Sequence, residues 1–320
     1  MAEASWGRGI FPHVVTGMRS FPQLVCYHKA VKNPVYNPES QGARMTIVCF
    51  VSGSGTNYQR IVERDPNHDY LVFTNRPGCA GAEKARAYGH KVIELSHIPY
   101  LKPARARHGP GATPRNCPER EKYEQDAWSL IEGAIQKAPD LVCLAGYDQW
   151  VTDWTVARYY PRMLNIHPGD TTRGYAGLHW VPTARAILAG DDELRSTVFF
   201  VDMGEDTGPV LAQSSPLDIT STLAAAGLIE KFHQVQAFAR SRAVTAWEDF
   251  ESCAGAELQE KMKTICQTLQ ESLKVAGDWQ IYPLAVHGLI ARGRVGVEDR
   301  TVIIDGRPMP AHGYRPDEQA

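Results

Sequence analysis

The stretch Ile47-Val48-Cys49-Phe50-Val51-Ser52-Gly53-Ser54-Gly55-Thr56-Asn57 joins an apolar run to a glycine-rich turn and then to the start of a helical pattern. The pattern predicts a buried strand over residues 45–52 and a helix over 56–64. Free backbone N–H groups at such a helix start suit a phosphate, although a plain tight turn has the same composition. A dinucleotide-binding turn needs a third glycine where this chain has Tyr58, and the second strand closes with Asn75 rather than an acid, which argues against nicotinamide binding.

The alternation of strands and helices continues outward from this turn. It predicts strand 69–75, helix 80–89, strand 91–95, a long Pro-, Arg- and Gly-rich loop over 97–118, helix 119–137 and strand 140–145. It then predicts a short helix near 153–159, a strand ending at His167, helix 181–189, strands 195–202 and 209–216, helix 279–292 and a hairpin over 295–304. This order predicts an α/β fold, with a Rossmann-like, doubly wound, mostly parallel sheet and helices on both faces.

Two segments lie outside the alternation. Residues 219–276 show apolar spacings of three and four, which predicts an inserted helical pair within a domain spanning residues 45–320. A role in stabilising the fold or a homo-oligomer is favoured for this insertion over a catalytic one. Residues 1–44 are too aromatic for a typical disordered tail and too irregular for a core, so we expect an N-terminal arm packed on the body or on a partner subunit.

The composition excludes several classes of protein. The chain has 34 basic and 36 acidic residues, a net charge of −2, which gives no electrostatic reason to expect a nucleic acid as the main partner. No apolar stretch approaches membrane-spanning length, and we expect no secretory signal. The seven cysteines form no C-x-x-C pair, and no histidine motif indicates a metal. We therefore expect a cytoplasmic protein without a metal or a disulfide framework.

Two further stretches carry the candidate chemistry. In Met163-Leu164-Asn165-Ile166-His167-Pro168 a buried strand ends, and the alternation of side chains puts Asn165 and His167 on one face. An amide N–H can donate to an oxyanion, and an imidazole can carry a proton near neutral pH. In residues 201–213 an acidic loop holding Asp202, Glu205 and Asp206 precedes another strand, and one of its carboxylates could hold the imidazole in its charged form. Alone, each stretch is more typical of a strand end or a turn.

Together, in this order and about forty residues apart, the two stretches resemble the signature of the folate-dependent formyltransferases. Residues 47–57 and the run Asp305-Gly306-Arg307-Pro308-Met309-Pro310-Ala311-His312-Gly313-Tyr314 resemble the branch that formylates glycinamide ribonucleotide in purine synthesis. The likeness covers roughly residues 45–215 and 278–317. It implies that 10-formyltetrahydrofolate donates a formyl group to the amine of a small phosphorylated acceptor, most simply glycinamide ribonucleotide.

The resemblance also implies roles for individual residues. Asn165 and His167 stabilise the oxyanion, His167 shuttles protons to the leaving folate nitrogen, and Asp206 keeps the imidazole protonated, with Asp202 and Glu205 as weaker candidates. The acceptor phosphate is expected at Gly55, Thr56 and Asn57, and Asp278 matches a family glutamate that contacts the acceptor amine. The pterin ring is expected at the loop holding Asp148, Gln149, Trp150 and Val151, and the folate tail at Arg120, which a solvated helix residue would also explain.

The sequence departs from the family in the acceptor region. Residues 169–177 replace a stiffer apolar loop, Asp278 is a shorter acid, and Gln149 stands where an arginine usually holds the folate tail. Arg173 in the changed loop is a candidate fork for phosphate or carboxylate, or simply a substitute for the family lysine. Three alternatives stay open: another amine acceptor such as an amino sugar phosphate or modified nucleotide, hydrolysis of formyltetrahydrofolate to formate, and a non-catalytic folate- or nucleotide-binding module. The related hydrolase carries a regulatory N-terminal domain, for which residues 1–44 are too short.

Overall fold

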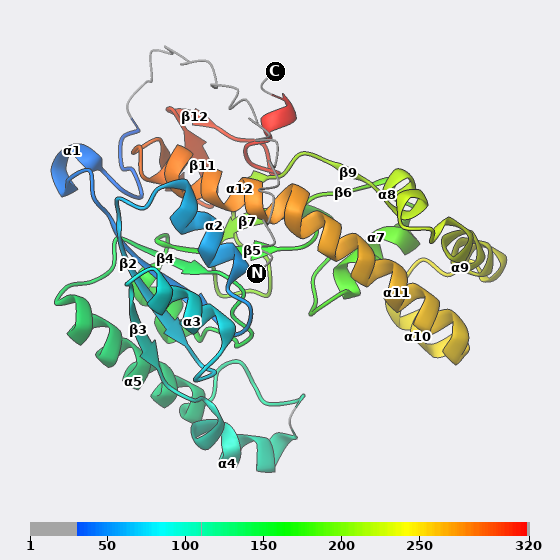
Figure 1. Ribbon diagram of the computed structural model, residues 1–320, viewed down its shortest axis with the longest axis horizontal. Coiled ribbons are helices and arrows are strands. Elements are labelled where there is room, and N and C mark those ends of the chain that lie inside the picture. Colours follow the sequence, from blue (N-terminus) through cyan, green and yellow to red (C-terminus); the bar gives the residue numbers. More distant parts are fainter. Residues whose placement is uncertain (1–30, 110, 319–320) are drawn as a thin grey trace, which may run out of the picture.

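The computed structural model describes residues 31–109 and 111–318 and centres on a seven-stranded sheet with the order β3-β2-β1-β4-β5-β7-β8 (Figure 1). The first five of these strands run parallel, β7 pairs antiparallel with β5 at one edge, and β8 pairs antiparallel with β7. The strands are β1 (Thr46–Val51), β2 (Asp69–Thr74), β3 (Lys91–Glu94), β4 (Leu141–Leu144), β5 (Met163–His167), β7 (Thr197–Phe200) and β8 (Val210–Gln213). The predicted mostly parallel sheet is confirmed.

Helices cover both faces of the sheet, because the side chains of β1 alternate between two apolar cores. Ile47, Cys49 and Val51 pack with helix α2 and the C-terminal helix, whereas Val48 and Phe50 pack with α5 and α6. All six residues of β1 are buried, which explains its continuous apolar run. The helices of the two faces are α2 (Thr56–Arg64), α3 (Ala80–Ala87), α5 (Pro118–Ile135) and α6 (Asp153–Tyr159), whereas α7 (Val181–Ala189) packs with the insertion.

Residues 97–118 contain a helix, so the prediction of a long loop there was wrong. Helix α4 (Ile98–His108) holds Pro99 in its first turn, where the missing N–H costs nothing, and Pro103 one turn later. Leu101 and Ala104 are buried, and basic side chains in the last turn complement the helix dipole. Burial and favourable charge therefore stabilise the helix by more than the loss of the one internal hydrogen bond at Pro103 costs.

The insertion forms four helices rather than the expected pair: α8 (Ile219–Ala225), α9 (Ile229–Arg242), α10 (Trp247–Cys253) and α11 (Ala256–Leu273). They extend to one side of the sheet (Figure 1) and share an apolar core with α7. The backbone stays helical beyond α11, through a π-helical turn at Lys274–Asp278, α12 (Trp279–Pro283) and a second π-helical turn at Leu284–Ile290. Where the sequence predicted two helices, one continuous helix joins the insertion to the sheet.

Short elements complete the fold at the C-terminal end. Strands β10 (Val295–Glu298), β11 (Thr301–Ile304) and β12 (Arg307–Pro308) form a small sheet, which confirms the predicted hairpin, and β6 (Glu193–Leu194) pairs with β9 (Leu217–Asp218). Before helix α1 (Pro38–Gln41), the N–H of Val35 donates to the carbonyl of Val295, and Tyr36 is fully buried. The rest of the expected arm, residues 1–30, lies outside the described residues. No helix of the described chain is long and apolar enough to cross a membrane.

Candidate active site

The end of β5 presents the amide and the imidazole expected there. Asn165 is half-buried, and its Oδ1 accepts from the N–H of Ile166 at 2.9 Å, so its NH₂ group remains available to donate. His167 is only 4 % exposed, and its Nε2 lies 2.7 Å from the carbonyl oxygen of Tyr175, to which it donates. This bond fixes the orientation of the ring and leaves Nδ1 as the nitrogen that can take part in proton transfer.

The acidic loop between β7 and β8, residues 202–207, brings Asp206 to His167. Its Oδ2 lies 3.4 Å from His167 Nδ1, and its backbone adopts a left-handed φ of 51°. Both ring nitrogens of His167 therefore face oxygen atoms, the carbonyl of Tyr175 and the carboxylate of Asp206. Asp206 thus lies beside the imidazole, and the role that the resemblance implies for it stays a prediction.

The other two acids of this loop have different surroundings. Asp202 is buried and accepts from the N–H of Gly204, the hydroxyl of Thr207 and the guanidinium of Arg300 at 3.0, 2.9 and 2.7 Å. Burial raises the pKa of Asp202, but these donors outweigh it and hold the pKa below its ordinary value. Asp202 thus organises the loop, whereas Glu205 is exposed.

The start of α2 joins two of the predicted acceptor residues. Asn57 Nδ2 donates to Oδ2 of Asp278 at 3.3 Å, across 221 positions of the chain, while Asn57 Oδ1 is buried without a partner. Gly55 precedes the helix with a φ of 63°, and a Cβ there would overlap the backbone of Gly81. Thr56 follows Gly55 as the first residue of the helix and is half-buried.

Asp278 lies at the end of the first π-helical turn and is 8 % exposed. Its Oδ1 accepts from the hydroxyl of Ser196 at 2.6 Å. Burial raises the pKa of Asp278 above its ordinary value, and Ser196, Asn57 and the charges of Lys274 and His167 offset the rise only in part. Asp278 and His167 are therefore electrostatic neighbours. Ser196 was missed from the sequence, because a serine before a strand has no distinguishing pattern.

The loop after β4 contains the expected folate residues. Asp148 forms an ion pair with Arg76 and accepts from Asn75 Nδ2 at 2.8 Å, and its own N–H donates to Ser52 Oγ at 2.9 Å. Trp150 is half-buried and Val151 buried. These contacts tie the loop to the ends of β1 and β2.

Arg120 joins the same loop, since its Nη1 donates to Gln149 Oε1 at 3.4 Å. It is 4 % exposed, its Nε is buried without a partner, and burial lowers its pKa. The alternative of a solvated helix residue is therefore wrong. Because Gln149 is neutral, its contact with Arg120 avoids the repulsion that two adjacent guanidinium groups would create.

Arg173 is engaged elsewhere. Its Nη1 forms an ion pair with Asp191 at 2.7 Å, and its guanidinium lies 5.3 Å from the centre of the Tyr175 ring. In the described residues, no hydrogen bond or ion pair joins Arg173 to Asn57 or Asp278. The structure thus brings the other predicted acceptor residues together and leaves Arg173 outside that group.

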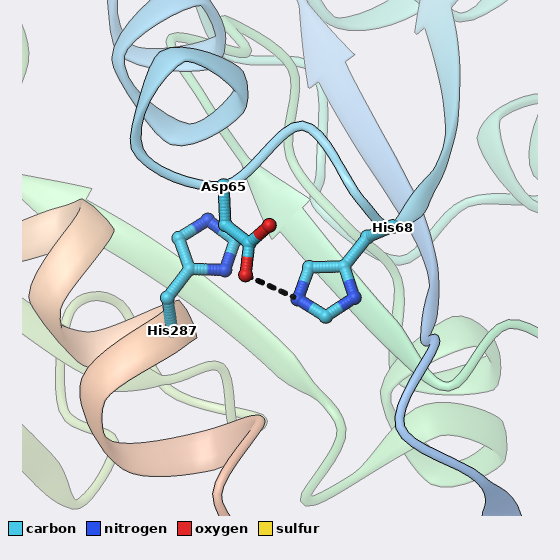
Figure 2. A group of neighbouring side chains, drawn as sticks. All are labelled: Asp65, His68 and His287. Atoms are coloured by element: carbon cyan, nitrogen blue, oxygen red, sulfur yellow. Dashed lines mark ion pairs between the residues drawn. The ribbon is translucent and has the colours of Figure 1, made fainter.

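One group in the described chain has the composition of a metal site, and its ligand atoms lie within 4.8 Å of one another: Asp65, His68 and His287 (Figure 2). The hydrogen bonds of the two rings decide what it can bind. His68 Nδ1 accepts from the N–H of Met45, so Nε2 of the neutral ring carries the proton, whereas His287 Nε2 donates to the carbonyl of Ile61 and leaves a lone pair on Nδ1. A cation could use only Asp65 and His287, so this group is a poor metal site.

Comparison with known proteins identifies a matching family and similar proteins. Residues 45–244 match the family model described as formyl transferase. The phosphoribosylglycinamide formyltransferase of Escherichia coli is 26 % identical over 282 residues, covering 86 % of this chain and 100 % of that protein. The trifunctional purine biosynthetic protein adenosine-3 of Drosophila melanogaster is 28 % identical over 208 residues, covering 63 % of this chain but only 14 % of that longer protein.

Solved structures share the fold. Glycinamide ribonucleotide transformylase 1 from Symbiobacterium toebii matches with a TM-score of 0.53 and 26 % identity, over 82 % of this chain and 95 % of that one. The phosphoribosylglycinamide formyltransferase of Coxiella burnetii matches with a TM-score of 0.56 and 23 % identity, over 85 % and 99 % of the two chains, a likeness that shows the fold alone.

Proposed function

Since its residues 45–244 match the family model, this chain belongs to the formyltransferase family, and we propose that it transfers the formyl group of 10-formyltetrahydrofolate to the amine of a phosphorylated acceptor. The observation that carries the proposal is the set formed by Asn165, His167 and Asp206. An amide with a free NH₂, a ring held by a backbone carbonyl and a carboxylate 3.4 Å from the other ring nitrogen suit acyl transfer through a tetrahedral intermediate.

The chemistry requires stabilisation of an oxyanion and movement of one proton. The acceptor amine attacks the formyl carbon, and the carbonyl oxygen becomes an oxyanion that the NH₂ of Asn165 stabilises by donating a hydrogen bond. When the bond from this carbon to the folate nitrogen breaks, that nitrogen gains a proton and the attacking amine loses one. His167 carries this proton through Nδ1, because Nε2 is committed to the carbonyl of Tyr175. Asp206 stabilises the charged ring while it holds this proton.

The acceptor is proposed to lie between the start of α2 and Asp278. Asn57 and Asp278 form one hydrogen-bonded group there, and the exposed turn residues Gly53 and Ser54 leave room for a phosphate. The buried carboxylate of Asp278 suits an acceptor amine, whose N–H group can donate a hydrogen bond to it. Glycinamide ribonucleotide is the leading acceptor, and the names of the relatives support it.

The donor is proposed to lie against the loop after β4, with its tail near Arg120 and Gln149. The guanidinium of Arg120, which contacts Gln149, supplies a positive charge that suits a tail carboxylate. We expect the tail to be held less tightly than by two arginines, because Gln149 provides no charge.

A turnover assay tests the proposal. The purified chain is incubated with 10-formyltetrahydrofolate and a panel of amines that includes glycinamide ribonucleotide and amino sugar phosphates, and products are identified by mass. Formylation of a phosphorylated amine, lost in His167→Asn, is the expected result. Formate release without an amine would instead identify a hydrolase, and donor binding without any turnover would identify a binding module; either outcome overturns the proposal.

A further inference from the structure

Arg115 lies between α4 and α5 and reaches two loops of the site from outside. Its Nε donates to the carbonyl of Val151 at 2.6 Å, in the donor loop, which we define as residues 148–151. Its Nη2 donates to the carbonyl of Asp202 at 3.0 Å, and its Nη1 to that of Gly204 at 3.2 Å and to that of Met203, all in the acid loop, residues 202–207. We propose that Arg115 is a positioning residue that couples the donor loop to the acid loop.

The chemistry of the contact requires a guanidinium. Four backbone carbonyls from two loops converge on one side chain, which is 17 % exposed and also lies 3.4 Å from the carboxylate of Asp153. Carbonyl dipoles that converge in this way repel one another unless a cation lies between them. Arginine supplies five N–H donors in a planar fork, whereas lysine places its charge at a single point and cannot reach both loops in the same geometry.

The acid loop has a second anchor, which does not touch the donor loop. Arg300, in the turn between β10 and β11, donates to Oδ2 of Asp202 at 2.7 Å and to the carbonyl of Thr207 at 2.8 Å. Asp206 lies between these two anchors with a left-handed backbone. The loop is therefore held on both sides of Asp206, and of these two anchors Arg115 is the one with a hydrogen bond to the donor loop.

This inference rests on the proposed function. The experiment has two arms, and the first, hydrogen exchange, does not depend on that function. Hydrogen exchange of the backbone amides in both loops is measured for the wild type, Arg115→Lys and Arg300→Lys. Arg107→Lys is the matched control, since Arg107 pairs with Glu119 outside the site. We expect Arg115→Lys to speed exchange in both loops about tenfold or more, Arg300→Lys to speed it in the acid loop only, and the control to change neither.

Steady-state kinetics form the second arm. Arg115→Lys is expected to raise the KM for 10-formyltetrahydrofolate and to lower kcat by roughly 10- to 100-fold, because a shift of about 1 Å in a catalytic group has that effect. Arg300→Lys is expected to lower kcat while the donor KM stays within about twofold, and the acceptor KM should be unchanged in both variants. Donor-loop exchange that is unchanged in Arg115→Lys overturns the inference. Wild-type protein without formyl transfer overturns the proposed function alone, and the exchange arm still decides the coupling. If Arg115→Lys does not fold, Arg115→Gln replaces it.

Discussion

Removal of the His287 imidazole should make the protein more resistant to acid. The ring is 8 % exposed, stacks on His68 with centroids 5.1 Å apart, and keeps a buried Nδ1 without a partner (Figure 2). Burial lowers the pKa of His287 from 6.5 to about 4; the bond to Ile61 and the charge of Asp65 oppose this shift, and His68 and Arg64 add to it. Since the folded ring binds its proton less readily than the unfolded ring, acid favours unfolding between these two pKa values.

The size of the effect follows from the same two values. The difference of about 2.5 pKa units (6.5 − 4) corresponds to ~3.4 kcal/mol of unfolding free energy, all of it present above pH 6.5 and lost as the pH falls to about 4. Between pH 6.5 and 4.5 the loss is about 2 kcal/mol. His287→Gln keeps a donor for the carbonyl of Ile61 but has no proton to bind.

Urea unfolding at several pH values measures this difference. The stability of His287→Gln should fall by about 2 kcal/mol less than that of the wild type between pH 6.5 and 4.5. His233→Gln, which changes an exposed histidine on α9, should follow the wild type and serves as the control. Parallel pH dependences of the wild type and His287→Gln would refute the reasoning, because they would mean that His287 is protonated as readily in the folded chain as in the unfolded one.

Three further predictions concern the site. Asn165→Ala should lower kcat by about 10²–10³-fold with donor binding retained, measured by single-turnover kinetics and calorimetry, and near-normal turnover would remove Asn165 from the mechanism. Gly55→Ala should destabilise the fold by roughly 2–5 kcal/mol through left-handed strain and overlap with Gly81, while Gly53→Ala, with open space around its Cβ, should leave stability within about 0.5 kcal/mol and raise only the acceptor KM. An unchanged acceptor KM in Gly53→Ala would place the phosphate elsewhere. With glycinamide ribonucleotide, kcat/KM should fall below about 10⁴ M⁻¹s⁻¹ if the acceptor pocket has changed, and a higher value would show that it has not.

Strong local patterns made much of the fold predictable. The helices over 56–64, 153–159 and 181–189 and the end of the strand at His167 agree with the structure to the residue. Each has a local sequence signal for its start or end. Gly190, for example, ends α7 with a φ of 84°. Local signals also misled: the prolines of α4 indicated a loop, but burial of one helical face decided its conformation.

The parts of the site that were missed depend on long-range contacts without a sequence pattern. The partner of His167 Nε2 and the partners of Arg115 are mostly backbone carbonyls, which every residue possesses. Gly277 reads as a helix breaker, yet a Cβ at this position would lie 2.5 Å from Ser196 Oγ, so close packing requires a glycine within a continuous helix. The residue types at these positions give no sequence signal for such contacts.

The changed loop 169–177, the shorter acid Asp278 and the helical insertion 219–276 are joined in the structure. The loop that follows His167 leads to His179, whose carbonyl accepts from the side chain of Gln270 on α11. The same helix continues to Asp278, with Leu273 packed in the core of the insertion and Tyr282 in the core of the sheet. Asp278 therefore lies where the insertion meets the sheet, and both cores determine its position. Gln149, the remaining departure, lies in the donor loop and contacts Arg120. The connection of the other three favours a changed acceptor pocket over independent substitutions.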